Sequence, residues 1–217
     1  MSLDLVFLGP PGAGKGTQAK TCAERHGLSH VSTGDLFRQN LKEETPVGLM
    51  ARGFMDKGLL VPDEVACQMV RECLEGEGDT EGFILDGFPR TIAQAETLDG
   101  DLSRMQRPLT AVVSFEIADG MLTERLTGRL TCRDCSTPFH VAFNPPEQEG
   151  VCDACAGELC TRDDDTEQAV GARLSEYRDK SAPLLDFYET RGLLCGVDAA
   201  QPVDGVSTAL ERALEDR

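Results

Sequence analysis

Residues 9–17 read Gly-Pro-Pro-Gly-Ala-Gly-Lys-Gly-Thr and directly follow the apolar run Leu5-Val6-Phe7-Leu8. The glycines let the backbone adopt conformations that a side chain would block, so that several N–H groups can converge on one anion. Residues 14–26 have a helical pattern, and the positive end of a helix favours phosphate. Lys15 adds a point charge for the β- and γ-phosphates. The stretch therefore predicts a phosphate-binding loop between a strand and a helix, and not a glycine-rich turn with a chance lysine.

Predicted strands and helices alternate along the rest of the chain. The apolar runs predict strands at 3–8, 28–31, 82–86, 111–117 and 193–197. The helical patterns cover 14–26, 36–41, 48–56, 62–74, 91–105, 119–125, 166–190 and 205–214, with Pro183 a predicted kink or break. Residues 130–161 carry cysteines and prolines with little periodicity. This order predicts an α/β fold, in which helices flank a parallel sheet and a small insert is added.

Asp86 ends the predicted strand at 82–86. Ligands of parallel sheets bind beyond the carboxyl ends of the strands, so Asp86 and the loop at Gly9 can share one site. A carboxylate beside the phosphates can hold magnesium, which keeps several of its waters. The alternative is that Asp86 caps the next helix. Next to a phosphate loop, we favour the magnesium role.

The composition points to an acidic protein with a buried core. The formal net charge is -17, from 38 acidic and 21 basic residues, which disfavours general nucleic-acid binding. No apolar run approaches the ~20 residues that span a bilayer, and residues 1–4 lack the basic start of a signal peptide. We therefore expect a soluble cytoplasmic protein. The low lysine content also suggests a hypersaline cytoplasm, a hypothesis that a melting temperature independent of potassium chloride would refute.

Four of the nine cysteines form two Cys-x-x-Cys pairs, at Cys132, Cys135, Cys152 and Cys155. Two such pairs supply four thiolates in a tetrahedron around one zinc ion, and four protein ligands leave no open position for catalysis. We therefore predict a structural zinc that holds together an insert too short to build a core of its own. His140 is interpreted as packing or polar support. The remaining cysteines are expected to be small core residues.

Arginines gather in the segments that carry motifs. Guanidinium groups bind phosphate oxygens through two parallel hydrogen bonds, so several arginines in an otherwise acidic chain predict a phosphate clamp. The arginines of this set are Arg38, Arg90, Arg125, Arg129, Arg162 and Arg173.

Together these motifs resemble the adenylate kinase family over nearly the whole chain. The loop is similar to that family's phosphate loop, where a glycine follows the lysine, as Gly16 does here before Thr17. Residues 32–38 resemble the AMP-site segment. So does Asp86-Gly-Phe-Pro-Arg90, the most specific match, because general phosphate-loop proteins lack it. The insert at 132–155 resembles the zinc-bearing lid of the family's long form.

The resemblance implies reversible, magnesium-dependent phosphoryl transfer, in which ATP and AMP give two ADP. The residues that it assigns to ATP are Gly12, Ala13, Gly14, Lys15, Gly16, Thr17, Arg125, Arg129, Phe139 and Gln201. The residues that it assigns to AMP are Thr33, Arg38, Leu59, Leu60, Val61, Gly87, Phe88, Pro89, Arg90, Gln94, Arg162 and Arg173. The catalytic set is Lys15, Asp86, Arg90, Arg129, Arg162 and Arg173. No general base is needed, because an AMP phosphate oxygen is already ionised at neutral pH.

The resemblance also implies how the chain is divided. The core is expected at 1–31, 62–127 and 166–217, the AMP-binding part at 32–61 and the zinc lid at 128–165, with a hinge at Gly128. The Gln94 amide can pair with a donor and an acceptor on adenine, and Phe139 is expected to pack on a base. We expect a monomer that binds ATP, AMP and ADP, with no nucleic-acid or membrane partner.

Three other functions fit parts of the pattern. A phosphate-loop kinase for UMP, CMP or a small metabolite shares the loop, but Gln94 and the arginine set argue against it. A zinc-ribbon module for nucleic acid is disfavoured by the net charge of -17. A GTPase function fits the sequence least well, because the Asn-Lys-x-Asp motif that recognises guanine is absent.

Overall fold

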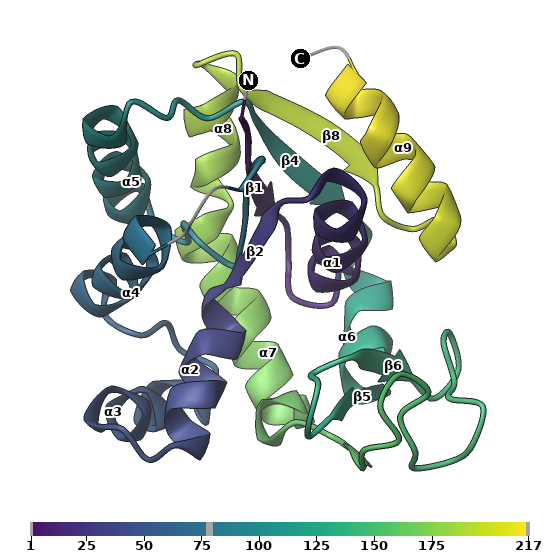
Figure 1. The fold of residues 1–217 in the computed structure, drawn as a ribbon. Coiled ribbons are helices and arrows are strands. Elements are labelled where there is room, and N and C mark those ends of the chain that lie inside the picture. Colours follow the sequence, from purple (N-terminus) through teal and green to yellow (C-terminus); the bar gives the residue numbers. More distant parts are fainter. Residues whose placement is uncertain (1, 77–79, 216–217) are drawn as a thin grey trace.

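Five parallel strands form the central sheet of the computed structural model, which describes residues 2–76 and 80–215 (Figure 1). The strand order is β2-β3-β1-β4-β8. The bounds are β1 Leu3–Leu8, β2 Ser29–Ser32, β3 Gly82–Asp86, β4 Ala111–Glu116 and β8 Leu194–Asp198. Each strand pair in this sheet is parallel, which confirms the predicted fold class. Asp86 lies in register with Phe7 of β1 and Ser32 of β2, so three strands end together at one edge.

Helices cover both faces of this sheet (Figure 1). Side chains of β1 alternate between the faces, because successive residues of a strand point in opposite directions. Leu5 and Phe7 pack in a buried cluster with residues of α1 and α9, whereas Val6 and Leu8 pack with residues of α4, α5 and α8. The helices are α1 Lys15–His26, α2 Thr33–Lys42, α3 Pro46–Met55, α4 Asp63–Gly76, α5 Ile92–Met105, α6 Asp119–Thr127, α7 Glu167–Glu176, α8 Pro183–Glu189 and α9 Val203–Glu215.

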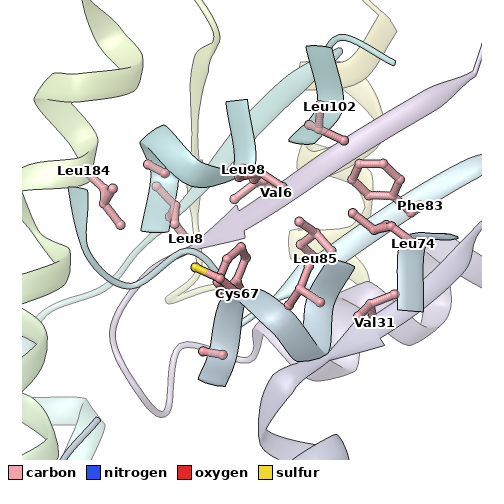
Figure 2. Packing of buried hydrophobic residues seen from close by; sticks show 14 of the residues in the cluster. Val6, Leu8, Val31, Cys67, Leu74, Phe83, Leu85, Leu98, Leu102 and Leu184 are labelled. Carbon is pink, nitrogen blue, oxygen red and sulfur yellow. The ribbon is translucent and has the colours of Figure 1, made fainter. Parts of the chain in front are cut away.

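Figure 2 shows the packing on the α4, α5 and α8 side of the sheet. Leu98 of α5 lies near Val6 and Leu184 of α8 on the side of Leu8, and Cys67 of α4 belongs to the same apolar cluster. Cys67 and Cys22 are buried, as predicted for core cysteines. Cys73, Cys160 and Cys195 are half-buried.

A second, antiparallel sheet lies in the segment without sequence periodicity. Its order is β6-β5-β7, with β5 Arg129–Cys132, β6 Pro138–His140 and β7 Leu159–Cys160. Its small core joins Cys132, Phe139, Cys152 and Leu159. A short 3-10 turn, η1 Asp163–Asp165, connects it to α7.

Helix boundaries follow local chemistry. Thr45 caps α3 by accepting a hydrogen bond from Gly48 N at 3.1 Å, and Pro46 occupies the first turn. The predicted helix at 166–190 is interrupted by a π turn, η2 Tyr177–Ser181. Here Ala182 N donates to Tyr177 O at 2.9 Å, just before Pro183, which has no N–H to continue an α-helix. Within the described ranges, no helix has both the length and the apolarity needed to cross a membrane.

Candidate active site

The loop between β1 and α1 has the geometry of a phosphate cradle. Gly12 and Gly14 both have φ of 88°, a conformation that L side chains rarely adopt. Gly14 is the N-cap of α1 and provides no side-chain cap, which leaves the first N–H groups of the helix available to an anion. Lys15 Nζ donates to Gly9 O at 2.7 Å and to Pro10 O at 2.9 Å, and so its ammonium lies folded over the loop.

Asp86 and Lys15 form a buried pair of opposite charges at the sheet edge. Burial lowers the pKa of Lys15 to about 8, against the opposing effect of Asp86. Burial alone would raise the pKa of Asp86, but His30, Lys15 and Arg90 together keep it below its usual range. His30 Nε2 lies 3.6 Å from Asp86 Oδ2. The carboxylate is therefore ionised at neutral pH, as a magnesium ligand must be.

A cavity of about 810 Å³ opens over this edge. The central sheet, the segments around α2 and α3, and the second sheet all contribute to its lining. Each residue that the sequence analysis assigned to a nucleotide or to catalysis lines this cavity: Gly12, Ala13, Gly14, Lys15, Gly16, Thr17, Thr33, Arg38, Leu59, Leu60, Val61, Asp86, Gly87, Phe88, Pro89, Arg90, Gln94, Arg125, Arg129, Phe139, Arg162, Arg173 and Gln201.

Two arginines of the cavity share one buried carboxylate. Arg129 binds Asp165 through Nε at 2.8 Å and Nη2 at 2.5 Å. Arg173 Nη1 lies 2.9 Å from Asp165 Oδ1 and 3.1 Å from Asp164 Oδ2. The two aspartates hold both guanidinium groups in place, so less side-chain entropy remains to be lost when a ligand binds.

Further cations crowd the same space. Burial lowers the pKa of Arg162 to about 9 and that of Arg90 to about 10, and neighbouring arginines act in the same direction. Arg90 Nε donates to Gly87 O at 2.7 Å, and Arg162 Nε donates to Thr131 Oγ1 at 3.0 Å. Like charges at close range repel one another, and a polyanion in the cavity would relieve that repulsion.

The opposite end of the cavity is formed by residues of the predicted AMP-binding part. Thr33 Oγ1 donates to Gly87 O at 2.9 Å, linking α2 to the loop after β3. Arg38 Nη2 lies 2.6 Å from Asp35 Oδ1.

Gln94 is buried and uses both ends of its amide within the protein. Its Oε1 accepts from Arg90 N at 2.7 Å, and its Nε2 donates to Asp63 Oδ1 at 2.7 Å. One N–H and one lone pair of the amide remain for a base. These two contacts fix the orientation of the Gln94 side chain. The sequence indicated the residue but not these contacts.

Two aromatic residues of the segment at 129–160 line the cavity but differ in exposure. Phe139 is 7 % exposed and packs mainly in the small core of the second sheet. Phe143 is 54 % exposed and also lines the cavity, with its ring 4.4 Å from that of His140. His140 accepts from the N–H groups of Ala142 and Phe143 at 3.0 and 3.1 Å, which agrees with the predicted polar support. The sequence analysis missed Phe143, and the nearby Phe-His-x-x-Phe pattern was the available signal.

At the far end of α6, Arg125 Nη1 donates to Ala199 O at 3.0 Å. This contact joins α6 to the loop after β8. Gln201 lies in the same loop and donates from Nε2 to Asp198 Oδ2 at 3.4 Å.

The four predicted metal ligands meet in the second sheet. Cys132, Cys135, Cys152 and Cys155 place their Sγ atoms within 4.8 Å of one another. Three pairs of these sulfur atoms are 3.3 to 3.6 Å apart, well beyond a disulfide bond and near the roughly 3.8 Å expected between thiolates around zinc. Ser136 and Ala156 both have positive φ, and their N–H groups donate to Cys132 O and Cys152 O. The two pairs therefore form matching turns that aim four sulfurs at one point.

Comparisons with known proteins agree with this geometry. A model of the family described as adenylate kinase matches residues 7–193. An adenylate kinase from Carboxydothermus hydrogenoformans is 49 % identical over 213 residues, which cover 98 % of this chain and 100 % of that protein. One from Geobacillus sp. (strain WCH70) is 46 % identical over 212 residues, covering 98 % of both chains. With a phosphate cradle, an arginine-lined cavity and this similarity along its length, the chain belongs to the adenylate kinase family of phosphotransferases.

Proposed function

We propose that the residues of the cavity perform the family's reaction, ATP + AMP = 2 ADP, with the two nucleotides placed end to end. One cluster of cations carries this assignment: Arg90, Arg129, Arg162 and Arg173 line the same cavity as Lys15. One nucleotide triphosphate fills the loop, and the arginines beyond it supply guanidinium groups for the phosphate of a second nucleotide.

ATP occupies the end of the cavity at α1 and the lid segment. Residues 12–17 bind the β- and γ-phosphates through backbone N–H groups and Lys15. Phe143 is the exposed aromatic ring on this side, so we assign it the stacking contact with adenine, with Phe139 supporting the lid beneath it. Arg125 and Gln201 flank the same end.

AMP occupies the end between α2, α3 and the loop after β3. Thr33, Arg38 and Arg90 face its phosphate, and Leu59, Leu60 and Val61 line the space for its base. Because its amide is fixed by Arg90 and Asp63, Gln94 presents its remaining donor and acceptor in one orientation to adenine. Uracil presents a carbonyl and an N–H there, the reverse of adenine, whereas cytosine carries a similar edge on a smaller ring that leaves part of the space lined by Leu59, Leu60 and Val61 empty.

The transfer itself requires alignment and charge stabilisation. The attacking AMP oxygen is already ionised, so no protein base has to remove a proton. Lys15, Arg90, Arg129, Arg162 and Arg173 neutralise the charge on the transferring phosphoryl group, in positions that are set before the substrates arrive. Asp86 is the residue that would hold magnesium, because its carboxylate is ionised at the mouth of the loop. Bound magnesium supplies charge neutralisation on the ATP phosphates.

The segment at 128–165 acts as a lid, 32–61 as the AMP-binding part, and the remainder as the core. Closing the lid excludes water, which would otherwise hydrolyse ATP. Zinc on the four cysteines is structural, because four protein thiolates leave it no open position. The enzyme works as a cytoplasmic monomer without a nucleic-acid or membrane partner.

The decisive assay is AMP-dependent ADP formation from Mg·ATP, with CMP and UMP as parallel acceptors. We expect turnover with AMP to exceed turnover with either pyrimidine nucleotide by at least about 100-fold, since uracil mispairs with the fixed Gln94 amide and a single pyrimidine ring fills the base space poorly. Equal rates with UMP or CMP would favour the alternative kinase and refute the role of Gln94.

A further inference from the structure

A second cluster of metal-ligating side chains lies outside the cavity. Cys22, His26 and Glu211 bring one Sγ, one ring nitrogen and one carboxylate oxygen within 4.8 Å of one another. Cys22 and His26 are one turn apart on α1, and Glu211 lies on α9, which runs beside α1 (Figure 1). None of the three lines the nucleotide cavity.

The donor atoms of His26 and Glu211 are spaced nearly as in a tetrahedral site, and Cys22 Sγ lies within 4.8 Å of both. Bonds of about 2.0 to 2.3 Å around zinc place its ligand atoms roughly 3.3 to 3.7 Å apart. His26 Nε2 and Glu211 Oε2 are 2.9 Å apart, so an ion between them would separate them by only a few tenths of an ångström. A thiol, an imidazole and a carboxylate together suit Zn²⁺ or Co²⁺, whereas Mg²⁺ and Ca²⁺ prefer oxygen ligands alone.

The surroundings hold the donors and leave a path for an ion. Arg25 Nη1 binds Glu211 Oε1 at 2.8 Å, which orients the other carboxylate oxygen toward His26. Cys22 is 2 % exposed and packs with Leu210 and Leu214 of α9. The side chains of His26 and Glu211 are 33 % and 24 % exposed, so that an ion can enter from solvent and keep a water as its fourth ligand.

We propose that Cys22, His26 and Glu211 form a three-ligand site for a borderline divalent ion, Zn²⁺ or Co²⁺, distinct from the four-cysteine site. The bound ion ties α9 to α1, the helix that follows the phosphate loop. An ion that binds the folded chain stabilises it by mass action, so thermal stability rises with metal concentration. The affinity is moderate, because the ion must displace the thiol proton and lie near the Arg25 guanidinium.

The test uses full-length enzyme with zinc loaded in the four-cysteine site, titrated with Co²⁺ alone. We expect one further cobalt per chain, together with a thiolate-to-cobalt charge-transfer band, a melting temperature that rises with cobalt, and an unchanged zinc content. Cys22→Ser and His26→Gln should each lose the band and the rise in melting temperature. The control Cys67→Ser, which changes another buried cysteine, should keep both.

Three outcomes would overturn the proposal. They are no additional cobalt, additional cobalt without the charge-transfer band, and a band that persists in His26→Gln. If Cys22→Ser does not fold, His26→Gln still decides, because that side chain is partly exposed and is not part of the buried core.

Discussion

Individual side chains of this adenylate kinase are held in place before any substrate binds. Asp165 fixes Arg129 and Arg173, and backbone carbonyls hold Lys15 and Arg90. Preorganised charges stabilise a transition state without having to reorganise during the reaction. Substitutions at these positions should therefore affect turnover far more than they affect folding.

Replacing Arg90 with alanine removes a cavity cation to which we assign a contact with the transferring group. We expect kcat to fall by roughly 10²–10³-fold or more, in line with the loss of a preorganised donor. A coupled assay of ADP formation measures the effect. The matched control is Arg104→Ala, since Arg104 lies on α5 with a 68 % exposed side chain, and should keep full activity. An unchanged rate in Arg90→Ala would refute the assigned role.

The pKa of Lys15 predicts the pH above which the enzyme binds ATP less well. Because burial lowers its pKa to about 8, the free enzyme loses this positive charge as pH rises through 8, instead of near 10.5. We therefore expect kcat/KM for ATP to decline above pH 8, as this ratio reports groups of the free enzyme. Bound phosphates favour the protonated amine, so kcat should stay constant to higher pH. A kcat/KM profile that is flat to pH 10 would contradict the assignment.

The pair Phe143 and Phe139 separates base stacking from lid packing. Phe143→Ala should raise KM for ATP with little change in melting temperature, because this ring is 54 % exposed. Phe139→Ala should destabilise the lid, by about 3–5 kcal/mol if its core does not relax. Steady-state kinetics and calorimetry on both variants check this. Equal effects of both on KM and on melting would argue against separate roles.

At the scale of elements, features determined by neighbouring residues could be predicted from the sequence, and features determined by contacts between distant segments could not. The phosphate loop, β1 and β3 were predictable, because a few adjacent residues determine them. The strands β6 and β7 were not, since they are only 3 and 2 residues long and are positioned by the cysteine turns. The shared carboxylate of Asp165 and the Asp63 contact of Gln94 join segments distant in sequence, and no local pattern signals them. Nor does a pattern show that Phe143, not Phe139, is exposed.

We expect the second sheet to depend on zinc bound by the four cysteines. Its buried core is small, so the four thiolates contribute much of what keeps it folded. Cys132→Ser, or zinc removal by a chelator, should lower the melting temperature of the enzyme while activity at low temperature is affected less. Calorimetry with and without chelator tests this. Superimposable melting curves would show that zinc does not stabilise the lid.

At the scale of the whole molecule, an acidic protein places eight of its 21 basic residues around one cavity. The net charge is -17, yet the cavity gathers Lys15 and six arginines. The acidic exterior disfavours nucleic acids, while the interior attracts small polyphosphates. This contrast of charge, together with the length of the cavity over three strand ends, is the basis for placing two nucleotides in one site.

Equilibrium dialysis with saturating ADP and magnesium tests this central claim most directly, with total adenine nucleotide counted per chain. Interconversion of ADP into ATP and AMP during the measurement does not alter that count. Two nucleotides bound per chain is the predicted result. One nucleotide per chain at saturation would contradict the account, because the arginines beyond the phosphate loop would then have no second phosphate to bind.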